Sequence, residues 1–311
     1  MRVAIIDIGT NTVNLLIVDT RDDGSYNIIC STKETARLGK GGINDGLIAP
    51  DAIKRGLDAI DKHIATIAQV GGVDRIVAIG TSALRSAINA DEFAAAVKQR
   101  HGFDIRVISG VEEAQMVFDG VKQVLPLGMS RVLILDIGGG SCEFIIANKD
   151  GIAWRHSYEV GMSRVLDKFK PSNPITAKQI RDIEAYVRGG TQGLYDALRE
   201  VPTSTLLGTS GSFDTMAALV AARNHPLLNV KLSTSYEIPL PCFEETYRKI
   251  ITSTTEQRAA MKHMDPARVE LIVPGAIFIN FVIAEARIEQ LYQCSFALKQ
   301  GAVGQIINGN L

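Results

Sequence analysis

The hydrophobic and polar positions of the chain form short apolar runs that alternate with longer segments of helical spacing. The helical segments lie at residues 50–70, 89–102, 176–198, 274–288 and 298–307. The apolar runs predict β-strands, at residues 2–9, 13–20, 26–35, 75–80, 104–109, 131–138, 142–151 and 204–211. Strands that alternate with helices are typical of the α/β class.

Several residues mark where these helices begin and end. Pro50 suits a first helical turn. Asn89 with Glu92, and Thr176 with Gln179, have the spacing of capping boxes, and Gly102 is a stop signal. The segment at 274–288 is apolar on all sides, which predicts a buried helix.

One pattern occurs twice. "VAIIDIGTNTVNLLIVD" and "VLILDIGGGSCEFIIA" each consist of an apolar run, an Asp-Ile-Gly turn and a second apolar run. The copies lie about one small domain apart, so we expect two similar α/β halves whose hairpin-like starts make the sheets mixed. The turn-like residues 126–130 are the best boundary, which gives domains at 1–125 and 126–311.

Composition is that of an ordinary globular protein, with 46% apolar and 22% charged residues. The net charge of −1 provides no global basic field, so a polyanion has to be held by a local patch. The four cysteines are far apart, which argues against a disulfide framework and a zinc site. Neither a leader nor a membrane-length apolar run is visible, so we expect a cytoplasmic protein.

The two Gly-rich turns are candidates for phosphate binding, because glycine leaves backbone N–H groups accessible to phosphate oxygens. The alternative is a purely structural hairpin, although two copies favour function. Asp7 and Asp136 end the preceding strands, where they could hold a divalent cation or its waters. The turns contain Gly9, Thr10, Asn11, Gly138, Gly139, Gly140 and Ser141.

A third Gly-rich loop, in "LLGTSGSFDTMAALV", joins a strand to a helix. Gly208, Ser210, Gly211 and Ser212 lie at the expected N-terminus of that helix, where backbone N–H groups favour an anion. A plain β-α turn with serine caps is the competing interpretation.

Two neighbouring glutamates follow a predicted strand in "ISGVEEAQ". Ser109 and Glu112 have capping-box spacing, which gives Glu112 a structural role. For Glu113 two roles stay open: a solvated acid in the first turn of the helix, or a general base. Two more charged residues have open roles: Glu143 lies within an apolar strand, and Arg85 follows a strand end, where a surface position is the simpler reading.

Together the three loops resemble those of the actin, Hsp70 and sugar-kinase superfamily. "DIGTNTVNLLI", "GTSALRSAINADEF", "ISGVEEAQMVFDGV", "LDIGGGSCEFII" and "GTSGS" are more narrowly similar to the exopolyphosphatase / guanosine pentaphosphate phosphatase family, over nearly the whole chain. The resemblance implies two ribonuclease-H-like domains, with mixed sheets flanked by helices and an active-site cleft between them. It also allows the last helix to pack back on the first domain.

The resemblance also implies roles. Glu113 would activate the attacking water, Arg85 would contact phosphate, and Asp136 and Glu143, with Asp7, would contribute to a site for Mg²⁺ or another divalent cation. The implied reaction is hydrolysis of the terminal phosphoanhydride of inorganic polyphosphate, with guanosine pentaphosphate as the alternative substrate. A small-molecule kinase of the superfamily and a non-catalytic nucleotide sensor are alternatives from other classes.

The chain departs from the family in two places. Lys299 and Gln300 stand where members commonly have Arg and Glu, and we assign that change no role. Longer members carry a further C-terminal helical region, so we expect modest processivity here. We expect no nucleic-acid or membrane partner, and leave a homodimer open.

Overall fold

The structure, a computed structural model, describes residues 1–225 and 229–311. It divides the chain into two compact units. Unit 1 consists of Met1–Gly120 and Leu298–Leu311, and unit 2 of Val121–Ala297. The division falls a few residues before the boundary expected from the sequence, and the C-terminal segment belongs to unit 1.

Unit 1 is built on a five-stranded mixed sheet of order β3-β2-β1-β4-β5. β1, β2 and β3 are antiparallel neighbours, whereas β4 and β5 run parallel to β1. The carboxyl ends of β1, β4 and β5 therefore meet at one edge of the sheet. The strands are β1 (Arg2–Ile8), β2 (Thr12–Thr20), β3 (Tyr26–Thr35), β4 (Arg75–Gly80) and β5 (Ile105–Val107).

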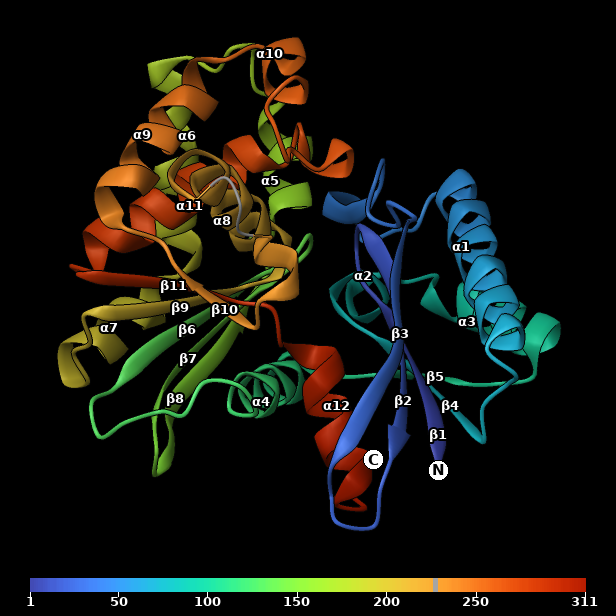
Figure 1. Cartoon of the computed structure of the whole chain (residues 1–311). Helices are drawn as coiled ribbons and strands as arrows, with labels where there is room; N and C mark the ends of the chain where they lie inside the picture. The colour runs from blue at the N-terminus through green and yellow to red at the C-terminus, as the bar shows by residue number, and fades with distance from the viewer. Residues whose placement is uncertain (226–228) are drawn as a thin grey trace. The chain divides into compact units, whose positions relative to one another are not determined.

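Helices cover both faces of this sheet (Figure 1). Alternate residues of β1 and β2 form one core with α1 (Pro50–Gln69) and α3 (Ala90–His101). On the other side, α12 (Leu298–Ile307) contacts β1 and β2. The two remaining helices of the unit are α2 (Ser82–Ser86) and α4 (Gly110–Val121), and the short 3-10 turn η1 (Ile43–Asp45) precedes α1.

α12 and α4 pack closely because α12 has a glycine, Gly301, where the two helices touch. A Cβ atom at Gly301 would lie 1.8 Å from the carbonyl oxygen of Met116 on α4. Gln305 of α12 also donates a hydrogen bond of 3.3 Å to Asp119. The C-terminal helix thus packs against the helix that carries Glu113.

Unit 2 repeats the same sheet plan with one additional strand. Its order is β10-β11-β9-β6-β7-β8, in which β6, β9 and β11 are parallel and the other neighbours antiparallel. The strands are β6 (Val132–Ile137), β7 (Cys142–Asn148), β8 (Gly151–Tyr158), β9 (Thr205–Thr209), β10 (Ser235–Glu237) and β11 (Gln290–Cys294).

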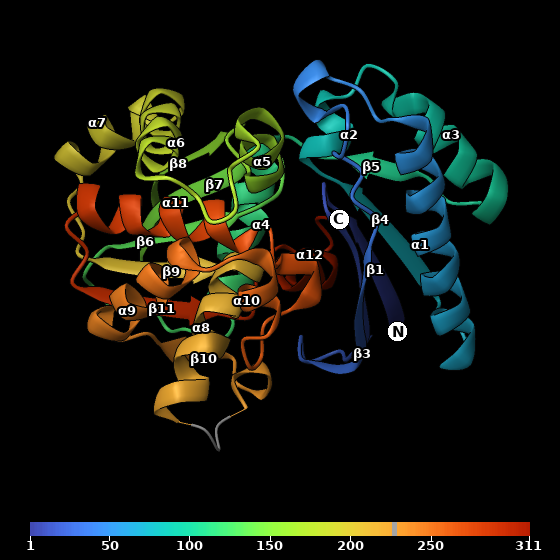
Figure 2. The same ribbon diagram turned by 90° about the horizontal axis from the view of Figure 1, so that it is seen from above.

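The apolar helix α11 (Ile272–Glu285) lies at the centre of the unit 2 helices, in contact with α5, α6, α8 and α9 (Figure 2). Ten of its residues are buried, which is why the sequence is apolar on all sides. The other elements are α5 (Met162–Phe169), α6 (Ala177–Gly190), α7 (Gln192–Glu200), α8 (Ser210–Asn224), α9 (Leu240–Thr252), α10 (Thr255–Ala259), η2 (Val230–Leu232) and η3 (Pro266–Arg268).

Most predicted elements are confirmed, and two expectations need correction. The single helix expected at 176–198 is two helices, α6 and α7, because consecutive glycines weaken the helix just before the break at Thr191. Asn89 precedes α3 as expected but makes no cap, since its amide exchanges hydrogen bonds with the backbone of Ile48. Strands β8, β10 and β11 were not predicted.

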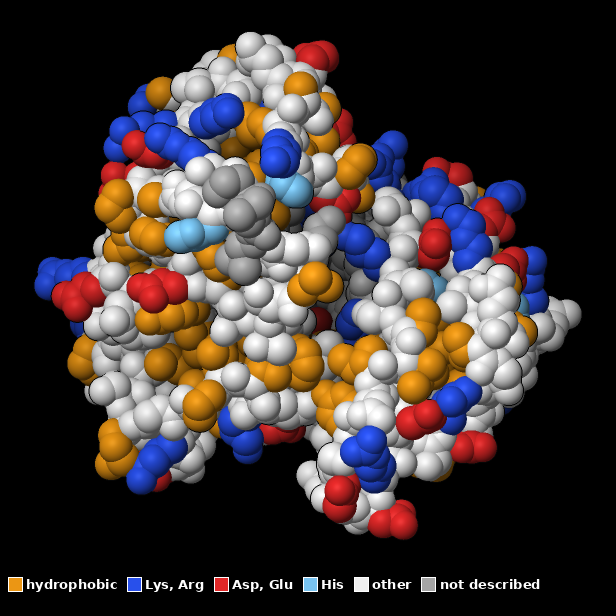
Figure 3. Space-filling model, viewed as in Figure 1, with side chains coloured by type: hydrophobic (Ala, Val, Ile, Leu, Met, Phe, Trp, Pro, Cys, Tyr) orange, Lys and Arg blue, Asp and Glu red, His pale blue; other side chains and the backbone are white. Residues whose placement is uncertain are grey.

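Other expectations from composition can be compared with the structure directly. All four cysteines are free. Within residues 1–225 and 229–311, no helix combines the length and the apolar character needed to cross a bilayer. On the face shown in Figure 3, basic and acidic side chains are interspersed, which fits the net charge near zero.

Candidate phosphate-handling site

The first Gly-rich turn joins β1 to β2 and is fixed by its own backbone. The N–H group of Gly9 donates to the carbonyl of Thr12 at 3.0 Å, and the segment after β3 donates to the carbonyls of Thr10 and Asn11 at 2.8–3.0 Å. Because peptide units are trans and planar, the N–H group of Asn11 points away from that segment. This orientation suits an anion on the open side of the turn.

Asp7 lies on β1 just before this turn, and its carboxylate already has neighbours. The Nδ2 atom of Asn14 on β2 donates to it at 2.9 Å. Burial raises the pKa of Asp7, while the positive charge of Lys299 and the bond from Asn14 oppose that rise. Lys299, one of the two departures from the family pattern, is therefore an electrostatic neighbour of the first turn.

Arg85 and Glu113 come from different elements and are in direct contact. The Nη1 atom of Arg85, on α2, lies 2.9 Å from the Oε2 atom of Glu113, on α4, and 3.1 Å from the carbonyl oxygen of Ile108. Glu113 is buried, with 7% of its surface exposed. A buried carboxylate is costly unless it is paired, so the structure places these two predicted residues together as a unit.

Glu112 has the structural role that its spacing predicted. Its Oε2 atom accepts a hydrogen bond from the N–H group of Ser109 at 2.8 Å, while the Ser109 hydroxyl accepts one from the N–H group of Glu112 at 3.2 Å. Arg106 donates to its other oxygen at 2.9 Å. These hydrogen bonds lower the pKa of Glu112, so its carboxylate is occupied with capping α4.

The second Gly-rich turn, between β6 and β7, is oriented by α5. The carbonyl groups of residues 138–140 accept hydrogen bonds of 2.8–3.0 Å from the backbone N–H groups of residues 161–163. Because each peptide unit is trans, the N–H groups of residues 139–141 point to the opposite side of the turn. The result is a row of backbone donors of the kind that binds phosphate oxygens.

Arg164 and Gly161 support this turn from behind. The Nε atom of the buried Arg164 donates to the carbonyl of Gly140 at 2.9 Å, and its Nη2 atom pairs with Glu159 at 2.5 Å. A Cβ atom at Gly161 would lie 2.4 Å from the backbone of Gly139 and Gly140. Neither residue was predicted from the sequence, because both act through a packing contact and carry no motif of their own.

Asp136 and Glu143 face one another across β6 and β7 as paired residues of the antiparallel ladder. Both are buried, and the hydroxyl of Ser157 donates to the Oε1 atom of Glu143 at 2.7 Å. Their negative charges contribute, after burial itself, to raising the pKa of Cys142. Among residues 1–225 and 229–311, no three His, Cys, Asp or Glu side chains gather as a metal cluster. Two buried carboxylates nevertheless fit Mg²⁺, which keeps several waters.

The third loop lies beside the second, because Asp136 on β6 is the ladder partner of Thr209 on β9. α8 begins at Ser210, whose φ of 69° is uncommon for a residue with a side chain. The hydroxyls of Thr209 and Ser212 are buried and make no hydrogen bond with any residue that the structure describes. Buried polar groups are normally paired, so these hydroxyls favour a polar ligand at the loop.

Gly208 and Gly211 are needed for close packing at this loop. A Cβ atom at Gly208 would lie 2.0 Å from the ring of Phe213, and one at Gly211 would lie 2.1 Å from the guanidinium of Arg268. The loop is therefore built around a residue that the sequence analysis did not single out. Burial lowers the pKa of Arg268, and the charges of Asp214, Asp265 and Asp136 oppose that shift.

Each unit thus collects its predicted residues at the carboxyl edge of its sheet. The first turn, Arg85 and Glu113 follow adjacent parallel strands of unit 1. The second and third loops, with Asp136 and Glu143, follow adjacent strands of unit 2. Ligands of α/β sheets commonly bind at such carboxyl ends.

Two units with this sheet order, each with a Gly-rich turn after its first strand, define a protein with the actin-like fold of paired ribonuclease-H-like domains. The model of the Ppx/GppA phosphatase family matches residues 17–308. The chain belongs to this family.

Individual relatives support the same assignment. The chain is 30% identical to Exopolyphosphatase 2 of Mycobacterium tuberculosis over 298 residues, which cover 92% of this chain and 91% of the relative. The crystal structure of an exopolyphosphatase from Cytophaga hutchinsonii superposes with a TM-score of 0.95 at 32% identity and covers 99% of this chain and 98% of that one. A guanosine-5'-triphosphate,3'-diphosphate pyrophosphatase of Vibrio atlanticus is 28% identical over 71% of this chain, but over only 44% of its own length.

Proposed function

We propose that this protein is an exopolyphosphatase, which hydrolyses the terminal phosphoanhydride bond of inorganic polyphosphate. The observation that carries the proposal is the contact between Arg85 and Glu113, together with the use of Glu112 in capping. Glu112 is occupied with the cap of α4, whereas Glu113 is buried beside the guanidinium of Arg85, a group that suits phosphate.

In this proposal Glu113 orients and deprotonates the attacking water. General-base catalysis requires a carboxylate within hydrogen-bond reach of the water. Arg85 holds Glu113 in position through its Nη1 atom, and its guanidinium would contact the phosphoryl group during transfer. The positive charge of the guanidinium suits the charge that develops on phosphate oxygens.

The turns hold the phosphate groups in this scheme. The backbone donors of residues 10–11 and 139–141, with the hydroxyls of Thr209 and Ser212, would bind phosphate oxygens; the N–H group of Gly9 instead closes the first turn. Hydrolysis of this kind depends mainly on positioning and electrostatics. The proposed base and Arg85 belong to unit 1, and the other two loops belong to unit 2.

We further propose that the activity depends on Mg²⁺ or another divalent cation held by Asp136 and Glu143. A bound cation would neutralise charge on the phosphate oxygens. The carboxylates are a buried facing pair, and Mg²⁺ prefers carboxylate oxygens and is commonly held by one or two of them. For Asp7 a role in cation binding stays a prediction, since Asn14 and Lys299 already engage its carboxylate.

We favour polyphosphate as the proposed substrate, because the relatives that align along most of their own length are named exopolyphosphatases. Guanosine pentaphosphate stays the second candidate, because the chain also matches part of the Vibrio atlanticus enzyme. The deciding experiment measures phosphate release from long-chain polyphosphate, guanosine pentaphosphate and ATP under identical conditions. We expect the highest kcat/KM on polyphosphate, and a higher value on guanosine pentaphosphate would assign the second activity instead.

A further inference from the structure

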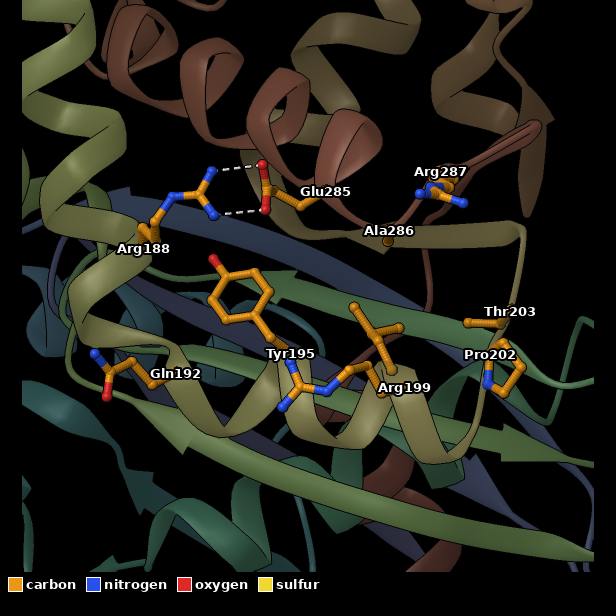
Figure 4. A pocket seen from close by; sticks show the side chains of 10 residues that line it. Arg188, Gln192, Tyr195, Arg199, Pro202, Thr203, Glu285, Ala286 and Arg287 are labelled. Carbon is orange, nitrogen blue, oxygen red and sulfur yellow. Dashed lines mark hydrogen bonds and ion pairs between the residues drawn. The ribbon is translucent and has the colours of Figure 1, made fainter.

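Unit 2 contains a cavity of about 750 Å³ that is separate from its Gly-rich loops (Figure 4). It lies among α6, α7, the residues before β9 and the residues after α11. The volume falls in the range of small-molecule sites, roughly 300–1,000 Å³.

The position of the cavity on the sheet separates it from the phosphate loops. Its lining includes Pro202 and Thr203, which precede β9, and Arg287, which precedes the parallel strand β11. The third loop follows the other end of β9. A five-residue strand at ~3.3 Å per residue spans roughly 13 Å, so the cavity lies at the amino edge of the sheet.

One wall of the cavity is built rigidly from an ion pair and a ring. Arg188 on α6 donates to both carboxylate oxygens of Glu285 at 2.8 and 2.6 Å. The same guanidinium lies 5.8 Å from the ring centre of Tyr195 and 5.1 Å from that of Phe281. Figure 4 shows Arg188, Glu285 and Tyr195 gathered on one side. Bidentate geometry with stacking fixes a guanidinium in one orientation.

Two further arginines, Arg199 and Arg287, line the cavity and take no part in the ion pair between Arg188 and Glu285. Arg199 pairs with Asp196, but both side chains are largely exposed, at 74% and 65%, so the pair is weak and open to exchange. Arg287 forms no ion pair with any residue in the described part of the chain. Its φ of 51° is also uncommon for a residue with a side chain. The lining contains three arginines and one glutamate, a formal charge of +2.

Beside the polar side chains of Gln192 and Thr203, the lining also has an apolar and aromatic part. Leu198, Pro202 and the ring of Tyr195 lie among the arginines. A site that combines an apolar surface with a few charged groups selects a ligand with the same two features. An inorganic anion would leave the apolar part without a partner.

We propose that this cavity is a second ligand site, which takes a small organic phosphate. Its phosphate groups pair with Arg199 and Arg287, and its ring or hydrocarbon part lies against Tyr195 and Leu198. The site is independent of the hydrolytic reaction, since none of its lining residues belongs to the turns or to the acidic pair.

The test is calorimetric titration of ATP and of inorganic tripolyphosphate into the full-length Glu113→Gln variant, in which we expect turnover to be suppressed. ATP should bind at two sites per chain, and tripolyphosphate at one. Adding Arg199→Gln and Arg287→Gln should weaken one of the two ATP sites at least about tenfold, because each substitution removes a charge-assisted contact.

Arg223→Gln is the matched control, since Arg223 is a similarly exposed arginine of unit 2 that pairs with Glu245 away from the cavity. It should leave both ATP sites intact. ATP binding whose stoichiometry and affinity are unchanged by the double substitution would overturn the proposal. If tripolyphosphate bound the second site as tightly as ATP, the proposal that the site selects an organic phosphate would be wrong. These readouts are binding stoichiometries, so they stand whether or not the protein hydrolyses polyphosphate.

Discussion

The guanidinium of Arg85 contacts the carboxylate of Glu113 at 2.9 Å, although the two residues lie on different helices. The two helices follow adjacent parallel strands, β4 and β5, so the contact is a consequence of the sheet order. Because the proposed general base and the proposed phosphate-binding cation share one hydrogen bond, we expect them to act together, and this coupling can be measured.

Replacing Glu113 by Gln should lower kcat by about 10²–10⁴, the usual cost of losing a general base. The amide keeps the shape of the side chain but cannot accept the proton. Glu112→Gln is the control on the neighbouring residue, because glutamine still completes a capping box with Ser109. Steady-state kinetics on polyphosphate decides the assignment, which is reversed if Glu112→Gln has the larger effect on kcat.

The coupling itself can be tested with a double-mutant cycle on Arg85→Lys and Glu113→Gln. Lysine keeps a positive charge but loses the planar fork that contacts Glu113 and Ile108. We expect kcat/KM to fall for each single variant and the double variant to be little worse than Glu113→Gln alone, since residues that act as a unit are non-additive. Strictly additive losses would mean that the two side chains act independently.

Much of this arrangement could be predicted from the sequence because its signals are local. The repeated strand–turn–strand pattern identified both turns, and the spacing of Ser109 and Glu112 identified the cap of α4. The contact of Arg85 with Glu113 was not predicted, since it depends on which strands become neighbours. Arg164 and Arg268 were missed for the same reason, as each reaches a loop distant in sequence. The predicted cap at Asn89 was wrong because of such a distant contact: its side chain accepts a hydrogen bond from the backbone of Ile48 and does not cap α3.

The packing of Gly161 against the second Gly-rich turn should be sensitive to the addition of a single methyl group. Gly161→Ala places a Cβ atom 2.4 Å from the backbone of Gly139 and Gly140, although the φ of −67° suits alanine. Overpacking of this kind costs about 1–3 kcal/mol, and displacement of the turn should also raise KM. Thermal unfolding and polyphosphate kinetics measure the two effects.

Gly189→Ala is the matched control for that substitution. Gly189 lies near the end of α6 with no atom within 4 Å of the added Cβ position. Alanine in a helix is favoured over glycine by roughly 0.5–1 kcal/mol, so this variant should be slightly more stable and keep its KM. If the two variants behave alike, the packing of Gly161 against the turn is unimportant.

The proposed cation site predicts a shift in metal dependence. Asp136→Asn and Glu143→Gln each remove a negative charge that a hard, oxygen-seeking cation prefers, so both variants should need more Mg²⁺ for half-maximal activity. Ser157→Ala removes only the hydrogen bond to Glu143 and should shift the Mg²⁺ titration less. Full activity of the parent protein in excess chelator would rule the site out.

The cap of α4 predicts a pH effect that is separate from catalysis. Hydrogen bonds from Ser109 and Arg106 lower the pKa of Glu112 below its ordinary value of 4.5. A carboxyl group whose pKa is lowered by folding stabilises the folded state above the unfolded pKa, and this stabilisation is lost as the pH falls through the folded pKa. The effect should therefore appear below about pH 4.5, as a fall in the free energy of unfolding. Urea unfolding of the parent and of Glu112→Gln between pH 3 and 7 measures it, and the difference between the two should shrink at the acid end. A constant difference across the range would show that the charge of Glu112 contributes nothing to the cap.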